Sequence, residues 1–148
     1  MKPNRILPDL QCALLCEDIR QEVSGNFILV GVIGLIRVPQ LPIYAAKLCV
    51  FNRWVAGLGQ FTEVVRLTAP DGATVLRQNA VKFQLNDPAQ AMTTVSVLQN
   101  LEFAQPGVYT LEILIDDVMK LRVPVPVMVV QPPPGQGAPP APTPAPQG

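Results

Sequence analysis

The stretch Gly107–Val130, GVYTLEILIDDVMKLRVPVPVMVV, predicts two long strands joined by a tight turn at Asp116-Asp117. In Val108–Ile115 the inward parity is apolar and consists of Tyr109, Leu111, Ile113 and Ile115, with Thr110 and Glu112 opposite. In Lys120–Val130 the inward parity is Leu121, Val123, Val125, Val127 and Val129, and the other parity carries Lys120, Arg122, Pro124 and Pro126. Such strict alternation is typical of a strand with one face on a core and one in water. Further strands must cover the apolar face of this hairpin.

Outward from this hairpin, apolar or alternating runs predict further strands. They lie at Leu10–Cys16, Phe27–Val38, Ala46–Val55, Gln60–Ala69, Thr74–Arg77, Ala80–Leu85 and Thr93–Phe103. Turn signals such as Ser24-Gly25-Asn26 and Pro70-Asp71-Gly72 separate them. Two intervals stay open: Glu17–Glu22 is a helical turn or an outer strand segment, and Ala89–Met92 is compatible with one helical turn. Roughly seven to nine short strands predict an all-β, antiparallel immunoglobulin-like β-sandwich, although the Cys…Trp…Cys hallmark of antibody-type domains is missing.

The composition divides the chain of 148 residues into three parts. We expect an extended lead-in over residues 1–9, a β-sandwich domain over residues 10–130, and a disordered proline-rich tail over residues 131–148. The tail holds eight prolines and no charge, which favours a spacer, with a PxxP peptide ligand at Pro139-Pro140-Ala-Pro-Thr-Pro144 as the alternative. Pro124 and Pro126 lack N–H donors on the same side of one strand, so that strand is expected at or near a sheet edge.

Charge and composition argue against several function classes. The net charge is zero without a basic stripe, so neither a nucleic acid nor an anionic membrane is expected as partner. Histidine is absent, which excludes Ser-His-Asp and Cys-His nucleophile systems and HExxH zinc sites. The apolar run Leu10–Cys16 is too short for a secretion signal, and Phe27–Ile36 is too short to span a bilayer as a helix. We therefore expect a cytoplasmic protein.

The three cysteines predict buried thiols rather than a bridge or a metal site. Cys12 and Cys16 on one strand would lie roughly 13 Å apart, beyond disulfide reach. A zinc site would need a second cysteine pair or histidines to accompany Cys-x3-Cys. We expect Cys12, Cys16 and Cys49 to be reduced and buried, and we predict no metal ion and no cofactor.

Three groups of residues are candidates for a ligand site, each with a structural alternative. Loop carboxylates at Asp71, Asp87 and Asp116-Asp117 suit calcium, but aspartate is also common in tight turns. Trp54, near Tyr44 and the loop Gly57-Leu58-Gly59, suits a sugar-stacking platform, although a tryptophan that closes the end of the core is favoured. Glu17-Asp18 with Glu22 suits acid–base work, although a solvated charged interval is favoured.

Two strands are apolar on both faces. Ile28, Val30 and Val32 share one parity, Phe27 and Leu29 share the other, and Leu48–Phe51 has no polar residue. In an antiparallel sandwich one strand face normally meets water, so a dimer or higher oligomer is predicted to cover the second face. The alternative is that Leu10–Cys16 or Glu17–Glu22 folds over this face within one chain. The predicted interaction residues are Ile28, Val30, Val32, Trp54 and Leu58.

Two segments carry a resemblance to a known family. They are Ala13–Glu22 (ALLCEDIRQE), followed by Gly31-Val-Ile-Gly34, and Pro106–Asp116 (PGVYTLEILID). The chain resembles, from about Leu10 to Val130, a family of short, functionally uncharacterised bacterial β-sandwich proteins, a domain of unknown function. The resemblance implies a bacterial, cytoplasmic β-sandwich and brings no catalytic or binding residues.

These observations favour a non-enzymatic structural or protein-interaction module that forms a homo-oligomer or binds another protein. The alternative is a small-ligand or carbohydrate-binding module that uses Trp54 and the adjacent loops. An enzyme ranks last.

Overall fold

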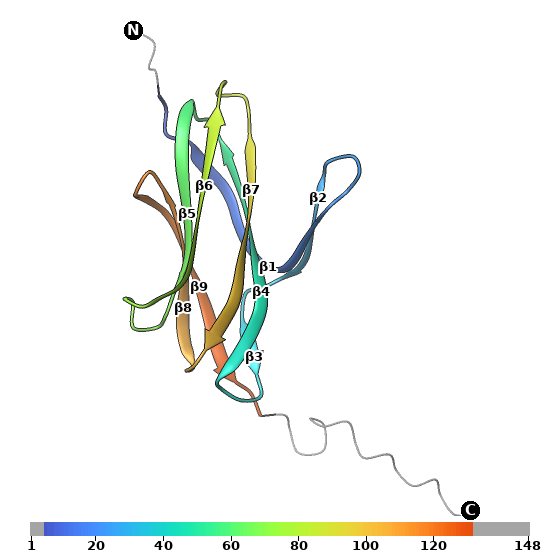
Figure 1. Ribbon diagram of the computed structural model, residues 1–148, viewed down its shortest axis with the longest axis vertical. Coiled ribbons are helices and arrows are strands. Elements are labelled where there is room, and N and C mark those ends of the chain that lie inside the picture. Colours follow the sequence, from blue (N-terminus) through green and yellow to red (C-terminus); the bar gives the residue numbers. More distant parts are fainter. Residues whose placement is uncertain (1–4, 132–148) are drawn as a thin grey trace, which may run out of the picture.

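The computed structural model of the chain describes residues 5–131. In this range the chain forms strands and no helix (Figure 1). The nine strands are β1 (Asp9–Gln21), β2 (Phe27–Val32), β3 (Ile36–Val38), β4 (Ile43–Val55), β5 (Gly59–Thr68), β6 (Val75–Leu85), β7 (Met92–Phe103), β8 (Gly107–Ile115) and β9 (Val118–Val129). The all-β prediction is therefore confirmed.

The strands form two sheets that pack face to face. One sheet has four strands in the order β2-β1-β4-β7, and the other has five in the order β3-β9-β8-β5-β6. Neighbouring strands are antiparallel except for β3 and β9, which pair in parallel. The core lies between the sheets and takes its buried side chains from both, among them Leu15, Val50 and Leu98 of the first sheet and Phe61, Leu111 and Val125 of the second.

The hairpin β8–β9 turns where the sequence predicts. Asp116 and Asp117 have φ angles of 45° and 66°, and Ile115 pairs with Val118 across the resulting two-residue turn. This left-handed backbone matches the twist of the flanking strands, and aspartate tolerates it. The prediction holds for the inward parity of β8, whose members are buried.

The predicted inward set of β9 is correct only in its middle. Val125 and Val127 are buried, whereas Leu121 and Val129 are exposed. A register shift lies between Ile113 and Leu114 of the partner strand, close to Leu121, and it disturbs the alternation there. Outside Val127–Val129 the edge of β9 is not covered by β3, so the predicted edge position of the two prolines is confirmed.

The predicted strand Phe27–Val38 is divided in two. β2 belongs to the four-stranded sheet and β3 to the five-stranded sheet, so the chain changes sheet over Ile33–Leu35. Gly31 has a φ of +65°, and a Cβ placed on it would lie 2.7 Å from the Glu17 carboxylate. Both features favour glycine here. A bulge or a close approach by another backbone, which Gly31 and Gly34 predict, is not found at Gly31: the approaching group is the Glu17 side chain, and the register with β1 is unbroken from Cys16 to Asp18.

The structure decides or corrects the predictions for three other segments. Glu17–Glu22 continues β1 as a strand to Gln21, which decides between the two alternatives. Thr74–Arg77 and Ala80–Leu85 join into one strand, β6. The helical turn at Ala89–Met92 is not formed, and β7 begins at Met92. Residues 1–4 of the predicted lead-in and residues 132–148 of the predicted tail lie outside the described residues.

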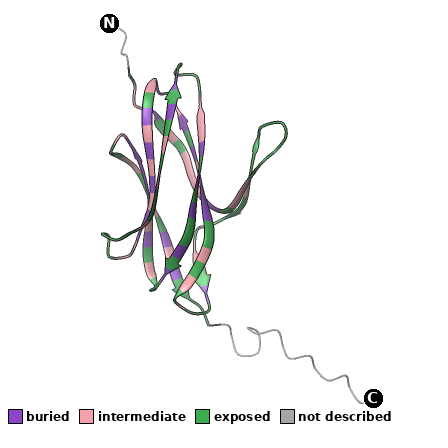
Figure 2. Cartoon of the chain, in the orientation of Figure 1, coloured by how far each residue is buried: buried purple, intermediate pink, exposed green. Residues whose placement is uncertain are grey.

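The C-terminal half of β1 and the whole of β2 leave the body as a two-stranded projection, visible at the right of Figure 1. We call this hairpin, residues 17–32, the arm. Most of its residues are exposed or half-buried, in contrast to the buried stripes that run through both sheets (Figure 2).

Candidate functional site

The arm exposes large apolar side chains on both of its faces. The exposed fractions are 36% for Phe27, 45% for Ile28, 38% for Val30 and 57% for Val32. Ile28 and Val30 stand opposite Arg20 and Asp18 of β1 and so share one face, while Phe27 and Leu29 lie on the other parity. The structure therefore brings the predicted residues Ile28, Val30 and Val32 together on one exposed strand.

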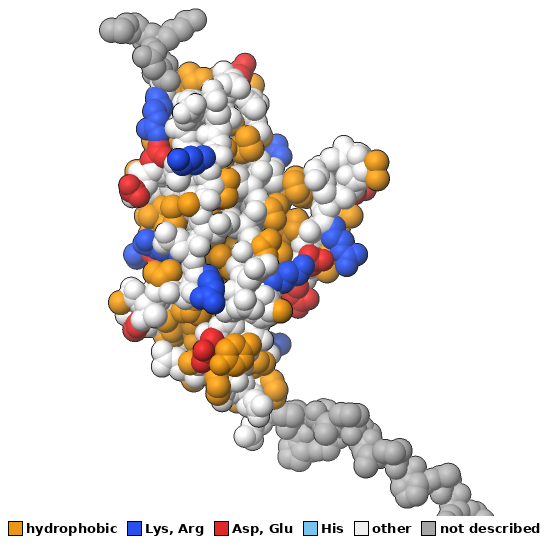
Figure 3. Space-filling view, in the orientation of Figure 1, with side chains coloured by type: hydrophobic (Ala, Val, Ile, Leu, Met, Phe, Trp, Pro, Cys, Tyr) orange, Lys and Arg blue, Asp and Glu red, His pale blue; other side chains and the backbone are white. Residues whose placement is uncertain are grey.

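The arm also leans back over the sheet from which it arises. The ring of Phe27 meets the ring of Phe51 of β4 edge to face, with centroids 5.7 Å apart. Beside Phe51 on this outer face lies the pair Cys16 and Cys49, both buried. Figure 3 shows hydrophobic side chains gathered in the seam between arm and body. The contact on this face comes from Phe27 of β2, and not from Leu10–Cys16 or Glu17–Glu22 as the intrachain alternative proposed. The remaining residues of β2 are exposed or half-buried.

A charged cluster attaches the base of the arm to β4. Asp18 accepts hydrogen bonds from Lys47 Nζ at 2.9 Å and from Arg20 Nε at 3.2 Å. The hydrogen bond from Lys47, followed by that from Arg20, holds the pKa of Asp18 below its ordinary value, and Asp18 raises the pKa of Lys47 in return. Asp18 is consequently an ion-pair partner rather than one half of an acid–base carboxylate pair.

Trp54 and Leu58 do not belong to an exposed site. Trp54 is fully buried, stacks on Phe83 with ring centroids 6.0 Å apart, and donates its indole N–H to Glu63. Leu58 is half-buried, and its backbone pairs with Ile6. A sugar-stacking platform on Trp54 is therefore wrong, because the indole has no face open to solvent. The favoured alternative, a tryptophan that closes the end of the core, agrees with its burial next to the last residue of β4.

The core contains a polar cluster around Glu63 that the sequence interpretation missed. Oε2 of Glu63 accepts hydrogen bonds from Trp54 Nε1, from Thr94 Oγ1 at 2.7 Å and from Asn52 Nδ2 at 3.2 Å. All four side chains are buried, and Oε1 of Glu63 and Oδ1 of Asn52 have no hydrogen-bond partner. The signal was present, because Glu63 lies on the same parity as Phe61 and Val65, the inward face of its strand. An enclosed carboxylate of this kind offers no route to a substrate.

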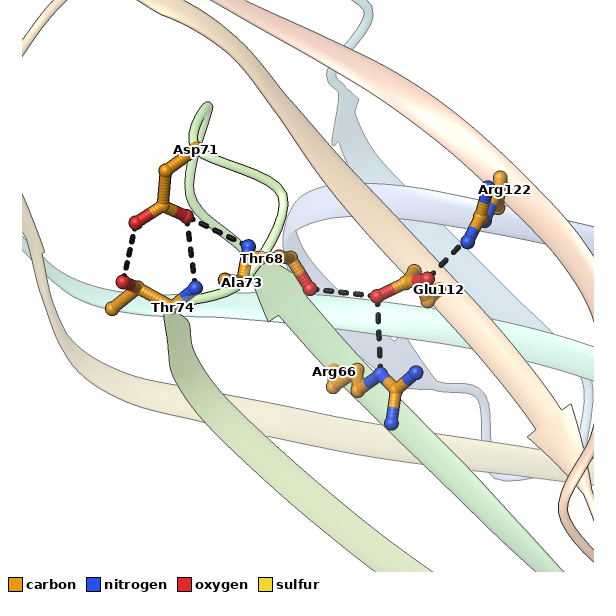
Figure 4. Close-up of polar contacts among 7 residues, drawn as sticks. All are labelled: Arg66, Thr68, Asp71, Ala73, Thr74, Glu112 and Arg122. Atoms are coloured by element: carbon orange, nitrogen blue, oxygen red, sulfur yellow. Dashed lines mark hydrogen bonds and ion pairs between the residues drawn. The ribbon is translucent and has the colours of Figure 1, made fainter.

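A second buried carboxylate, Glu112, lies on the outer face of the five-stranded sheet (Figure 4). It accepts hydrogen bonds from Thr68 Oγ1 at 2.7 Å, Arg66 Nε at 3.0 Å and Arg122 Nε at 3.2 Å. Burial favours the neutral form, but the hydrogen bonds from Thr68 and Arg66 and the charges of Arg66 and Arg122 outweigh it and hold the pKa of Glu112 below its ordinary value. The three donors come from the two neighbouring strands, so this cluster ties β5, β8 and β9 together.

Asp71 and Asp116 make hydrogen bonds or ion pairs within the fold. Asp71 accepts hydrogen bonds from the backbone N–H groups of Ala73 and Thr74, each at 2.8 Å (Figure 4). Asp116 forms an ion pair with Arg5 and accepts a hydrogen bond from the backbone of Thr62 at 2.8 Å. Within residues 5–131, no three acidic, cysteine or histidine side chains are grouped as a metal site would require. The turn interpretation accounts for Asp71 and for Asp87, which accepts a hydrogen bond from the backbone of Ala89 at 2.8 Å, whereas Asp116 also joins its turn to Arg5 and Thr62.

The described surface also contains a hollow of about 590 Å³ at one end of the two sheets. Its lining includes Tyr44, Asp71, Arg77 and Glu102. Asp71 is occupied by its turn, and the guanidinium of Arg77 donates to the backbone carbonyls of Gln99 and Asn100, both at 2.8 Å. The side chains of Asp71 and Arg77 are therefore already hydrogen-bonded to the backbone and are not free to bind a ligand in this hollow.

The three cysteines are free thiols. Cys16 and Cys49 are buried, as predicted, while Cys12 is only half-buried. Burial raises the pKa of the Cys16 thiol, and the neighbouring Cys49 adds to this effect. A raised pKa keeps a thiol protonated and unreactive, so Cys16 is a poor nucleophile.

Most of the chain matches the sequence model of a protein family. The sequence model of a family of unknown function (DUF6941) matches residues 11–128. No curated protein matches the chain. Among the residues that the structure describes, no helix is long and apolar enough to cross a membrane.

Proposed function

The chain belongs to DUF6941, a family of unknown function, and we propose that it is a non-enzymatic protein-interaction module whose contact surface is the arm. The observation that carries this proposal is the uncovered strand β2. Four of its six residues are large apolar side chains that are exposed by more than a third. Exposed apolar surface of this kind, when contiguous, marks contact sites for other proteins.

The position of the arm supports the same function. A two-stranded hairpin is marginally stable by itself in water, so a projecting one needs support. Here the ion pairs of Asp18 and the contact of Phe27 with Phe51 supply that support. An arm that is held in place while its apolar strand stays bare is suited to present that strand to a partner.

The buried carboxylates support a non-enzymatic role. Glu63 lies in the core with three donors, and Glu112 is held by three donors on the sheet face. Their hydrogen bonds serve packing between and within the sheets. The ligand-binding alternative loses its main residue, since Trp54 is buried.

We further propose an immunoglobulin-like arrangement and a cytoplasmic location. The hydroxyl of Tyr109, near the start of β8, donates to the backbone carbonyl of Gln105 at 2.8 Å, which resembles the tyrosine corner of immunoglobulin-like domains. Three free thiols suit a reducing compartment.

Affinity capture with three proteins tests the proposed function. The bait is the wild-type chain, the arm variant Val30→Lys, or the control Val108→Lys, which places the same charge at a valine of β8 that is 53% exposed. We expect partners, including other copies of the chain, to be captured by the wild type and the control and lost with Val30→Lys. Equal capture by all three proteins would refute the arm as the contact surface.

A further inference from the structure

We propose that the partner on the arm is a second copy of this chain, and that the two β2 strands pair edge to edge, antiparallel, about a two-fold axis perpendicular to the arm. This inference rests on the proposed function and adds to it both the partner and the mode of contact. It predicts one continuous sheet in which the four-stranded sheets of two copies are joined through their arms.

The first support is the free edge of β2. β2 is the terminal strand of its sheet and pairs with β1 alone. An edge strand presents a row of unpaired N–H and C=O groups, which is a template for another strand. The segment Phe27–Ile36 contains neither a charge nor a proline, the two usual means by which proteins block such pairing.

The second support is that the other sheet edges are protected. At β7, the carbonyls of Gln99 and Asn100 accept hydrogen bonds from Arg77. β6 carries Arg77 and Lys82, and β3 has only three residues, one of them Arg37. Edge charges and short edge strands disfavour pairing with another chain. Of the four edge strands in the described structure, β2 is the one that carries no charged side chain.

The third support is self-complementarity. A two-fold axis perpendicular to the plane of the two-stranded arm pairs the two β2 strands antiparallel. It also keeps the same face of β2 on the same side of the joined sheet in both copies. Ile28 and Val30 of the two copies then form one apolar row, and Phe27 and Leu29 form another on the opposite face. Cross-strand pairs of β-branched and aromatic side chains stabilise a sheet. A neutral strand also meets its own copy without repulsion between like charges, which a charged edge would suffer.

A two-part experiment tests the pairing. Light scattering from micromolar to submillimolar concentration measures the mass of the wild type, Val30→Lys and Val108→Lys. Hydrogen exchange of wild-type backbone amides is followed by mass spectrometry at the lowest and highest concentrations. We expect the wild type and Val108→Lys to dimerise, Val30→Lys to stay monomeric at 16.0 kDa, and amides of Phe27–Val32 to exchange about tenfold more slowly in the dimer.

The outcomes separate this inference from the proposed function. A dimer that is sensitive to Val30→Lys but leaves the exchange of β2 amides unchanged would overturn edge pairing and keep the arm as an apolar contact surface. A wild-type monomer throughout the range would overturn the second copy as partner, while arm-dependent capture of a different protein would keep the proposed function. A dimer unaffected by Val30→Lys would overturn both. Circular dichroism of each variant excludes misfolding as the cause of a monomer.

Discussion

The Glu63 cluster allows a sharp test of what holds the two sheets in register. In Glu63→Ala, the acceptor of three buried hydrogen bonds is lost, which leaves donors of Trp54, Thr94 and Asn52 without their partner. Each buried donor left unsatisfied costs about 1–3 kcal/mol, and the Thr94 hydroxyl can rotate toward another acceptor. We therefore expect Glu63→Ala to lower the free energy of unfolding by about 3–5 kcal/mol, a large part of the total for a typical domain.

Glu63→Gln is the matched control. Its amide oxygen replaces Oε2 as the acceptor, and its NH2 group adds a donor where Oε1 of Glu63 and Oδ1 of Asn52 have no partner. We expect this variant to lie within about 1 kcal/mol of the wild type, or to be more stable. The contrast between the two variants isolates the acceptor function of the side chain from its negative charge.

Urea unfolding at pH 7 measures both variants. Trp54 is the only tryptophan in the sequence and is itself part of the cluster, so its fluorescence reports unfolding directly. With a slope of about 1.5 kcal/mol per M urea, Glu63→Ala should move the midpoint by about 2–3 M, and Glu63→Gln by less than about 0.7 M. A Glu63→Gln variant as unstable as Glu63→Ala would refute the reasoning, because it would show that the negative charge is required.

Three further predictions concern the rest of the chain. The pKa of Glu112 is lowered in the folded state, so its contribution to stability is complete above the ordinary glutamate pKa and is lost as the pH falls through the folded value. We therefore expect Glu112→Gln to lower the free energy of unfolding by about 1–2 kcal/mol at pH 7 and to lose less stability than the wild type below about pH 4.5. Urea midpoints from pH 3 to 7 measure both effects. Gly31→Ala should loosen the arm, because the new Cβ would meet Glu17 at a backbone φ of +65°, and limited proteolysis should then cut within residues 17–32 faster than in wild type; an unchanged cleavage rate would contradict this account. Without prior reduction, alkylation in denaturant should modify all three cysteines, whereas under native conditions Cys16 and Cys49 should resist; a mass that shows fewer than three modified cysteines in denaturant would reveal a disulfide.

The sequence predicts the local elements well because one strong signal, two-residue alternation, determines them. The turn at Asp116-Asp117 and the inward parity of β8 follow directly from that alternation. Where a register shift interrupts β9, the same rule assigns Leu121 to the wrong environment, because a bulge depends on the partner strand and not on the strand's own sequence.

The arm shows a different limit. The sequence shows that both faces of the β2 strand carry apolar side chains, and the exposure of Ile28, Val30 and Val32 agrees with the expected uncovered face. That β2 projects from the body depends on the change of sheet at Ile33–Leu35, which is a matter of tertiary packing. Conversely, Trp54 looked like a possible platform in the sequence because its neighbours are loop residues, and only the packing of the opposite sheet encloses it.

The order of strands within the sheets has a consequence for how the chain folds. Pairs such as Ile43 with Phe103 and Thr68 with Thr110 join residues far apart in sequence, and topologies rich in distant pairs fold in milliseconds to seconds. The hairpin of β1 and β2 needs only a short loop and forms in microseconds. It is also synthesised before β4 and β7, which complete its sheet. Newly made chains therefore meet one another with both edges of this hairpin unpaired, and the proposed pairing of two β2 strands competes at that moment with aggregation.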